Sequence, residues 1–172
     1  MDMERYDFDT PVNRLHTDSM KWDGYCVPGH DLIPLWVADM DFKTAPEIVE
    51  ALVHRAAHGV FGYSFPGDEY YDAISSWFER RHHWHIDRHL FIPTTGVLPA
   101  LAAVLRAVTR PGDGVVVQTP VYNCFFSSIR NAGCRNMNAP LHLDSHGLYQ
   151  MDFESLEKAL ADPKSTAMVL CN

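Results

Sequence analysis

The pattern of hydrophobic and polar positions changes near residue 44. Residues 1–43 are rich in turn formers and aromatic residues and show little periodicity, which predicts an extended arm. The arm ends in an apolar run at residues 35–38, which predicts a short strand. Residues 44–172 carry regular apolar spacing, and we expect them to fold as a domain. The sequence therefore predicts two parts that meet between residues 43 and 44.

Several stretches of the second part have the spacing of helices, because apolar residues recur there every three or four positions. Thr44 and Glu47 have the spacing of a capping box at the start of the first helix, and Gly59 is expected to end it. Asp152 is expected to cap the last helix. The helices are predicted over residues 44–58, 68–82, 97–109, 122–132 and 153–160.

Short apolar runs between these helices predict strands, and the valine-rich run at residues 115–118 is the clearest of them. Because strands alternate with helices, the pattern predicts a parallel, doubly wound α/β sheet. Ligands of such sheets bind at the carboxyl ends of the strands. The strands are predicted at residues 90–92, 115–118, 137–141 and 167–171.

Composition and charge narrow the classes of function. The chain has 172 residues and a net charge of −8, which disfavours binding to nucleic acids. No apolar run reaches the roughly 20 residues of a membrane helix, and the N-terminus shows no apolar leader segment. The four cysteines are scattered, which suits buried thiols in a reducing compartment. We therefore expect a cytoplasmic protein without nucleic-acid or membrane partners.

Two segments lie where the predicted sheet would present its carboxyl edge. At Gly96 a predicted strand gives way to a helix, and the free N–H groups of a helix N-terminus attract anions. Tyr122 follows the strand at residues 115–118, where a flat aromatic ring could stack on a planar ligand. Taken alone, an ordinary turn and a core tyrosine are the favoured interpretations. The ten histidines lack the spacing of metal ligands, so we expect no metal site.

An ordered set of short segments extends this picture. Residues 36–42 read Trp-Val-Ala-Asp-Met-Asp-Phe, and Phe-Gly-Tyr, Thr-Gly-Val, Pro-Gly-Asp, Pro-Val-Tyr and Val-Leu-Cys-Asn follow in order along the chain. This string closely resembles the N-terminal part of fold-type I pyridoxal-phosphate enzymes. Within them it is most similar to the MalY/PatB group of cystathionine β-lyases, relatives of class I and II aminotransferases.

The resemblance covers nearly the whole chain and implies its architecture. It implies an α/β, truncated PLP-dependent transferase-like fold. Residues 1–43 would form the N-terminal arm and a small-domain segment. Residues 44–172 would form the first half of the doubly wound large domain, which binds the cofactor and is truncated at the C-terminus.

The resemblance also implies roles for individual residues in cofactor binding. Gly96, Val97 and Leu98 match the turn whose backbone N–H groups hold the phosphate of pyridoxal 5'-phosphate. Tyr122 matches the aromatic residue that stacks on the pyridine ring. Tyr63 matches a tyrosine that reaches across a homodimer interface to the phosphate bound by the other subunit.

Three further positions lie outside the cofactor turn. Ala38 matches the small residue whose backbone lies beside the carboxylate of the amino-acid substrate. Asp39 and Asp41 flank it and receive no acid–base role, because a polar turn is the favoured interpretation. Asn172 matches the first asparagine of the family's N-P-x-N-P segment, whereas the cofactor-contacting asparagine is the second.

Lysine limits the chemistry that this chain can carry. None of its lysines has the setting of the family's Schiff-base lysine, so no catalytic residue is assigned and all are expected to be solvated. The chain has four: Lys21, Lys43, Lys158 and Lys164.

The resemblance thus implies an N-terminal fragment of a pyridoxal-phosphate-dependent carbon–sulfur β-lyase for cystathionine- or cysteine-type substrates, inactive alone and without a covalently bound cofactor. Two alternatives stay open. One is a class I/II aminotransferase of the same fold. The other is a non-catalytic truncation product that acts, if at all, by binding a partner chain.

Overall fold

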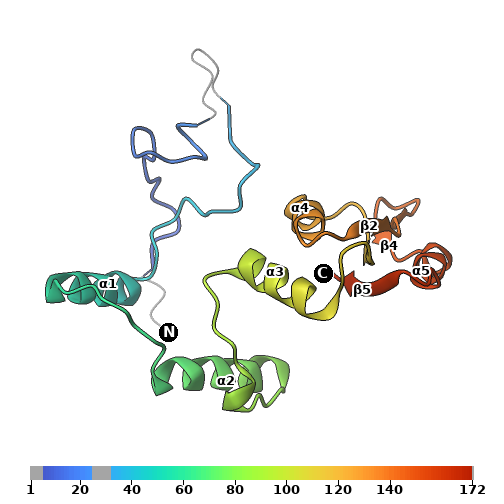
Figure 1. Ribbon diagram of the computed structural model, residues 1–172. Coiled ribbons are helices and arrows are strands. Elements are labelled where there is room, and N and C mark those ends of the chain that lie inside the picture. Colours follow the sequence, from blue (N-terminus) through green and yellow to red (C-terminus); the bar gives the residue numbers. More distant parts are fainter. Residues whose placement is uncertain (1–5, 25–31, 172) are drawn as a thin grey trace. The chain divides into compact units, whose positions relative to one another are not determined.

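The computed structural model describes residues 6–24 and 32–171 (Figure 1). The chain forms two compact units, Met1–Ser64 and Phe65–Asn172, and each is considered by itself. None of the described helices is long and apolar enough to cross a membrane.

The described part of the first unit contains one helix, α1 (Pro46–His58). Its N-cap is Ala45, and no side chain caps it, so the predicted capping box at Thr44 is wrong. Pro46 explains the shift, because its fixed φ suits the first helical position and keeps the preceding residue extended. Gly59 ends the helix as predicted, with a left-handed φ of 74°.

The arm segments before α1 form turns and bends. Residues 35–38 do not form the predicted strand, because no described segment lies alongside to pair with their backbone. A lone strand leaves its N–H and C=O groups without partners, so side chains take over this role. Next to this run, the ammonium group of Lys21 donates to the backbone oxygen of Asp39 at 2.8 Å.

The second unit opens with α2 (Asp68–His82), which has the predicted bounds. The strand predicted at residues 90–92 is wrong, because the chain forms the short 3₁₀ helix η2 (Arg88–Leu90) instead. The Leu90 N–H donates to the backbone oxygen of Asp87 at 3.0 Å. Such local bonds use the backbone groups that a strand would offer to a neighbour.

The second unit contains a three-stranded parallel sheet. The central strand β1 (Gly114–Val117) lies between β2 (Arg135–Asn138) and β5 (Ser165–Val169). Both pairings are parallel, which confirms the predicted α/β sheet. The two outer strands begin slightly earlier in the chain than the apolar runs had indicated.

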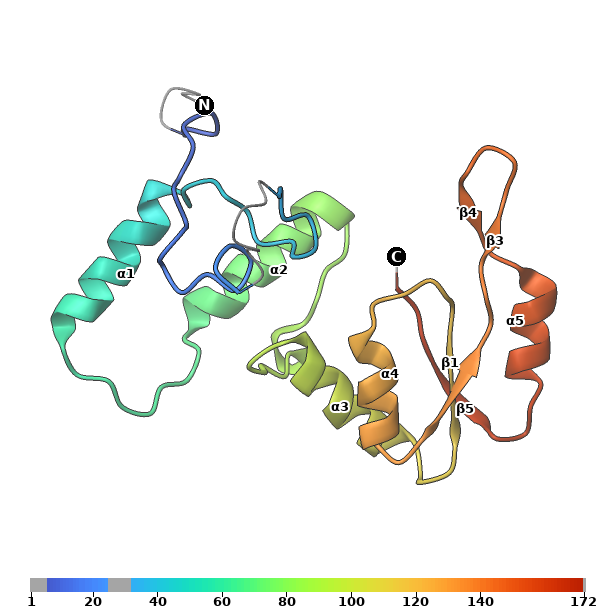
Figure 2. The same cartoon turned by 90° about the horizontal axis from the view of Figure 1, so that it is seen from above.

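Helices cover both faces of this sheet. Figure 2 shows α3 (Val97–Val108) and α4 (Cys124–Asn131) on one side and α5 (Phe153–Leu160) on the other. Each helix lies close to its predicted position, although α4 begins two residues later than expected, which leaves Tyr122 outside it. The three-layer arrangement is the doubly wound form that alternating strands and helices favour.

The alternation of side chains along β1 produces two small cores. Val115 packs on one face with Leu105 of α3 and Ile129 of α4. Val116 packs on the other face with Ala159 of α5. Both valines are fully buried, as expected for the central strand of a sheet covered on both faces.

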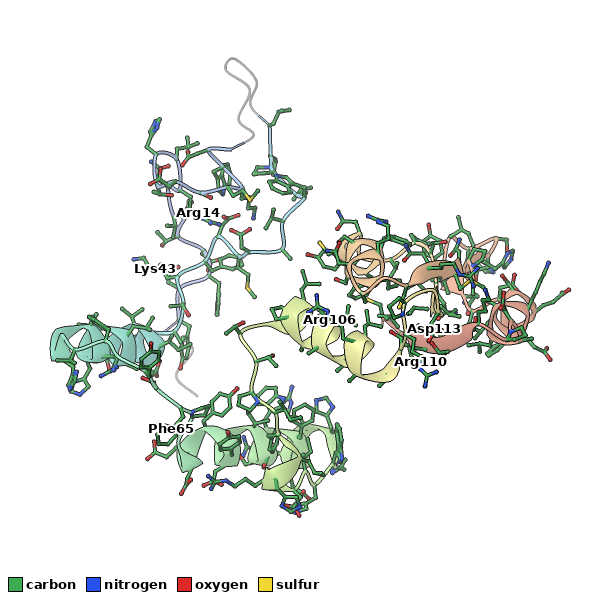
Figure 3. All side chains as sticks on the ribbon, in the orientation of Figure 1. Arg14, Lys43, Phe65, Arg106, Arg110 and Asp113 are labelled. Atoms are coloured by element: carbon green, nitrogen blue, oxygen red, sulfur yellow. The ribbon has the colours of Figure 1, made fainter. Side chains whose placement is uncertain are left out.

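Polar side chains fix the connections around the sheet. At the turn from α3 into β1, the Arg110 N–H donates to the Asp113 carboxylate at 2.8 Å, and Figure 3 labels both residues there. Asp152 caps α5 as predicted, since its carboxylate accepts from the Ser155 N–H at 3.0 Å.

An antiparallel hairpin that the sequence did not predict precedes α5. Its strands are β3 (His142–Leu143) and β4 (Tyr149–Gln150). The Asp144 carboxylate accepts from the Leu148 N–H at 2.9 Å and holds the turn, and Gly147 has a φ of 78°. Strands of two residues are too short for periodicity to reveal.

Candidate functional site

The turn that leads into α3 is built around Gly96. Its φ of 157° and ψ of 170° belong to a region that residues with a Cβ rarely adopt. The Thr94 hydroxyl donates to the Gly96 backbone oxygen at 3.1 Å, and the Ala100 N–H donates to the same oxygen at 3.1 Å. The turn therefore fixes where α3 starts.

The first N–H groups of α3 are the polar groups that this turn offers. Helix geometry provides no intrahelical acceptor for the N–H groups of Val97 and Leu98, and no hydrogen bond found among the described residues uses either. Pro99 carries no N–H. The positive end of the helix dipole adds to these two donors, so the start of α3 suits an anion.

Tyr122 lies between β1 and α4, just beyond the carboxyl end of the central strand, as predicted. Its side chain is 53% exposed, so the interpretation as a core tyrosine is wrong. The Phe125 ring packs edge-on against it, with 5.6 Å between ring centroids. Hydrogen bonding with the Cys124 side chain raises the pKa of Tyr122 above its ordinary value of 10, so the phenol is neutral at physiological pH.

These two features share one cleft. It has a volume of about 450 Å³ and lies at the carboxyl edge of the sheet, where the ligands of such sheets bind. Four predicted site residues line it, together with three that the sequence reasoning missed: Gly96, Val97, Leu98 and Tyr122, with Pro99, Phe125 and Cys171.

The order of the strands could have revealed residues that the sequence reasoning missed. Cys171 follows β5, which lies beside β1, so both strands end at the same edge. Its side chain is exposed, contrary to the expectation of buried thiols, whereas Cys134 is buried and Cys124 is half-buried. Cys26 and Asn172 lie outside the described residues, and their predictions stay untested.

The remaining predicted site residues, Ala38 and Tyr63, belong to the first unit. Both side chains are exposed, and that of Tyr63 is fully so. Ala38 lies in the segment 36–42, which also carries Asp39 and Asp41.

Asp41 is the centre of a charged cluster in this unit (Figure 3 labels Arg14). Its carboxylate accepts hydrogen bonds from Lys21 at 2.8 Å, from the Trp22 indole at 2.8 Å and from Arg14 at 2.7 Å. Arg14 also forms an ion pair with Asp39 at 2.6 Å. The bonds from Lys21, Trp22 and Arg14, in that order, hold the pKa of Asp41 far below its ordinary value of 3.8. Asp41 is therefore ionised at physiological pH and is no proton donor.

The lysines divide between the two units. The prediction that Lys21 is solvated is wrong, because only 8% of the residue is exposed. Lys43, Lys158 and Lys164 are exposed, as predicted. Lys158 lies on α5, on the face of the sheet opposite α3. The Lys164 backbone oxygen accepts from the Gly114 N–H at 2.6 Å, which places it at the amino edge of the sheet, away from the cleft.

The described residues contain no group of three side chains that could hold a metal ion. The site thus consists of a helix start that suits an anion, beside an exposed aromatic ring.

Comparisons with known proteins identify the family of the chain. The sequence profile of the family Aminotransferase class I and II matches residues 30–172. Cystathionine beta-lyase PatB of Bacillus subtilis is 42% identical over 167 residues, and the match covers 96% of this chain and 43% of PatB. Protein MalY of Escherichia coli is 36% identical over 171 residues, with 97% of this chain and 43% of MalY covered.

The fold matches solved structures as well. Cystalysin from Treponema denticola, whose structure contains a pyridoxal 5'-phosphate cofactor, has a TM-score of 0.84 and 37% identity, over 95% of this chain and 42% of cystalysin. The chain thus spans less than half the length of these relatives and corresponds to their N-terminal part. The predicted resemblance and the α/β fold are confirmed. On the evidence of the profile match, the chain belongs to the aminotransferase class I and II family.

Proposed function

We propose that this chain provides the phosphate cradle and the stacking aromatic residue of a pyridoxal-phosphate-dependent carbon–sulfur β-lyase. The observation that carries the proposal is the shared cleft of Tyr122 and the turn Gly96, Val97 and Leu98. PatB is a cystathionine β-lyase, which favours cystathionine- or cysteine-type substrates.

The cleft residues fit the chemistry of this cofactor. A phosphate group suits the two unpaired N–H groups of Val97 and Leu98 at the start of α3. A planar pyridine ring suits the exposed face of Tyr122. Bound pyridoxal phosphate supplies the electron sink for bond breaking at the substrate's α- and β-carbons.

The residues around the cleft orient rather than react. Phe125 packs edge-on against Tyr122 and restricts its ring. The neutral phenol of Tyr122 avoids placing a negative charge beside an anionic ligand. A role for Ala38 of the first unit is also part of the proposal: its small side chain would leave its backbone open to the carboxylate of an amino-acid substrate.

The proposal includes a homodimer. The fully exposed side chain of Tyr63 is free to reach the phosphate held by a second copy of the chain.

On its own, the 172-residue chain is proposed to lack lyase activity. Lys158 and Lys164 lie away from the cleft, on the opposite face and at the opposite edge of the sheet. The Lys21 ammonium group forms an ion pair with Asp41 at 2.8 Å. A lysine nucleophile with a free amine is what this reaction class requires.

The test incubates the purified chain with pyridoxal phosphate and cystathionine and follows pyruvate release. We expect none above the rate of free pyridoxal phosphate. After borohydride treatment, mass spectrometry should find no stoichiometrically modified lysine. Sustained pyruvate release, or one fully modified lysine, would contradict the proposal.

Aminotransferase activity is the second candidate, and the match to the family profile favours it. The same incubation with an added 2-oxo acid separates the two activities, because a transaminase converts that 2-oxo acid into the corresponding amino acid, whereas a lyase releases pyruvate and ammonia and leaves the added 2-oxo acid unchanged. We expect no new amino acid from this chain.

A further inference from the structure

We propose that Asp41 is a positioning residue, whose carboxylate ties the segment 36–42 to Arg14, Lys21 and Trp22 and thereby fixes the backbone around Ala38. The functional meaning rests on the proposed function, because the position of Ala38 matters only if it lies beside the substrate.

Both carboxylate oxygens of Asp41 accept hydrogen bonds. One oxygen accepts from the Arg14 guanidinium at 2.7 Å and from the Trp22 indole at 2.8 Å. The other accepts from Lys21 at 2.8 Å. Three donors that lie far from Asp41 in sequence therefore converge on one side chain.

The same cations also reach the residue that follows Ala38. Lys21 donates to the Asp39 backbone oxygen at 2.8 Å, and Arg14 pairs with the Asp39 carboxylate at 2.6 Å. The segment is thus held both at Asp39 and at Asp41. With two attachment points so close to Ala38, its backbone has little freedom to shift.

The burial of Lys21 separates this cluster from an ordinary surface ion pair. The side chain of Lys21 is 9% exposed and that of Arg14 is 24% exposed, whereas those of Asp41 and Asp39 are 36% and 39% exposed. Two cations face two carboxylates, so the charges balance, and a buried lysine is tolerated only when it is paired in this way. Removing Asp41 would leave Lys21 without its carboxylate partner.

The experiment uses nuclear magnetic resonance on the 172-residue chain, with Asp41→Ala compared with Asp9→Ala, an exposed aspartate of the same unit. In Asp41→Ala we expect the Trp22 indole N–H to exchange with water about tenfold faster, because its acceptor is lost. Backbone order parameters at residues 38–41 should fall from about 0.85 to below about 0.6. Asp9→Ala should change neither.

A second pair of variants distinguishes positioning from general support of the fold. In Lys21→Arg, the exchange rate of the Trp22 indole N–H and the order parameter of Ala38 should match those of the parent chain. In Lys21→Met, the exchange rate should rise and the order parameter should fall. The resonances of α1 should stay unchanged throughout. If Asp41→Ala leaves residues 38–41 ordered, or if it collapses α1 together with them, the positioning role is wrong.

The same samples also test the proposed function, by a separate measurement. Adding pyridoxal phosphate should shift the Val97 and Leu98 amide resonances of every variant. If these shifts do not occur but the order of segment 36–42 depends on Asp41, the proposed function is overturned and the positioning role stands. If the shifts occur but the order of the segment does not depend on Asp41, only the positioning role is overturned.

Discussion

Tyr122 shows how far a single residue can be interpreted from sequence. Its place after a valine-rich strand predicts that it lies at the carboxyl edge of the sheet, and the structure confirms this. The partners Phe125 and Cys171 were missed, because lining a cleft depends on which strands are neighbours, and periodicity does not give strand order.

Replacing Tyr122 tests its stacking role. Tyr122→Leu keeps apolar bulk but removes the aromatic face, so we expect pyridoxal phosphate to bind about three- to tenfold more weakly. The change can be followed by fluorescence titration of the chain. Tyr149→Leu is the matched control, since Tyr149 is 56% exposed on β4 and does not line the cleft. Equal affinities for the Tyr122 variant and the parent would show that the ring does not contact the cofactor.

Lys21 shows what sequence could not reveal at this scale. Its burial depends on a carboxylate twenty positions along the chain, Asp41, and nothing in local patterning links the two. A lysine is solvated by default, and only the tertiary contact reverses that expectation. The contacts of Arg14 also depend on carboxylates far along the chain. Hydrogen bonds to Asp41 and Asp39 raise the pKa of Arg14.

At the level of elements, helices were predicted better than strands. The bounds of α2 follow directly from its apolar spacing, whereas the runs at residues 35–38 and 90–92 form no strand. Helical hydrogen bonds are local to a segment, but a strand needs a partner elsewhere in the chain. A strand does form within residues 115–118, because β2 and β5 supply such partners on both sides.

The central strand should dominate the stability of the second unit. Val116→Ala removes two buried methyl groups from a fully buried site, so we expect the free energy of unfolding to fall by about 2 kcal/mol. Urea denaturation followed by circular dichroism measures this change. Val104→Ala on α3 is the control, because Val104 is 56% exposed and should cost well below 1 kcal/mol, or about that of a surface substitution. Equal losses in both variants would argue against a core centred on β1.

For the whole molecule, acid sensitivity follows from the paired carboxylates. Hydrogen bonds and ion pairs lower the native pKa of five aspartates below their ordinary value of 3.8: Asp7, Asp23, Asp41, Asp68 and Asp144. A carboxylate whose pKa is lower in the folded chain stabilises the fold above its unfolded pKa, and this contribution is lost as pH falls toward the native pKa.

These groups should therefore have no effect on the melting temperature of the chain near neutral pH. When the pH is lowered below about 4, the melting temperature should decrease. Circular dichroism melts between pH 7 and pH 2.5 measure this. In Asp41→Asn the acid-dependent part of the fall should shrink, because the carboxyl with the lowest pKa is gone. A melting temperature that rises on acidification would contradict the assigned pairings.

The family and the α/β fold were predictable from sequence, because they depend on an ordered set of segments spread over the chain. The chain covers 43% of PatB. The contribution that we propose for this chain is cofactor recognition through the start of α3.

That contribution is tested most directly by comparing pyridoxal 5'-phosphate with pyridoxal, which has the same ring and no phosphate. In a nuclear magnetic resonance titration of the 172-residue chain, pyridoxal phosphate should shift the amide resonances of Val97 and Leu98 saturably, since these N–H groups have no partner among the described residues. Pyridoxal should leave both amides nearly unmoved at the same concentration. Equal shifts with both compounds, or none with pyridoxal phosphate, would show that the start of α3 does not hold the cofactor phosphate.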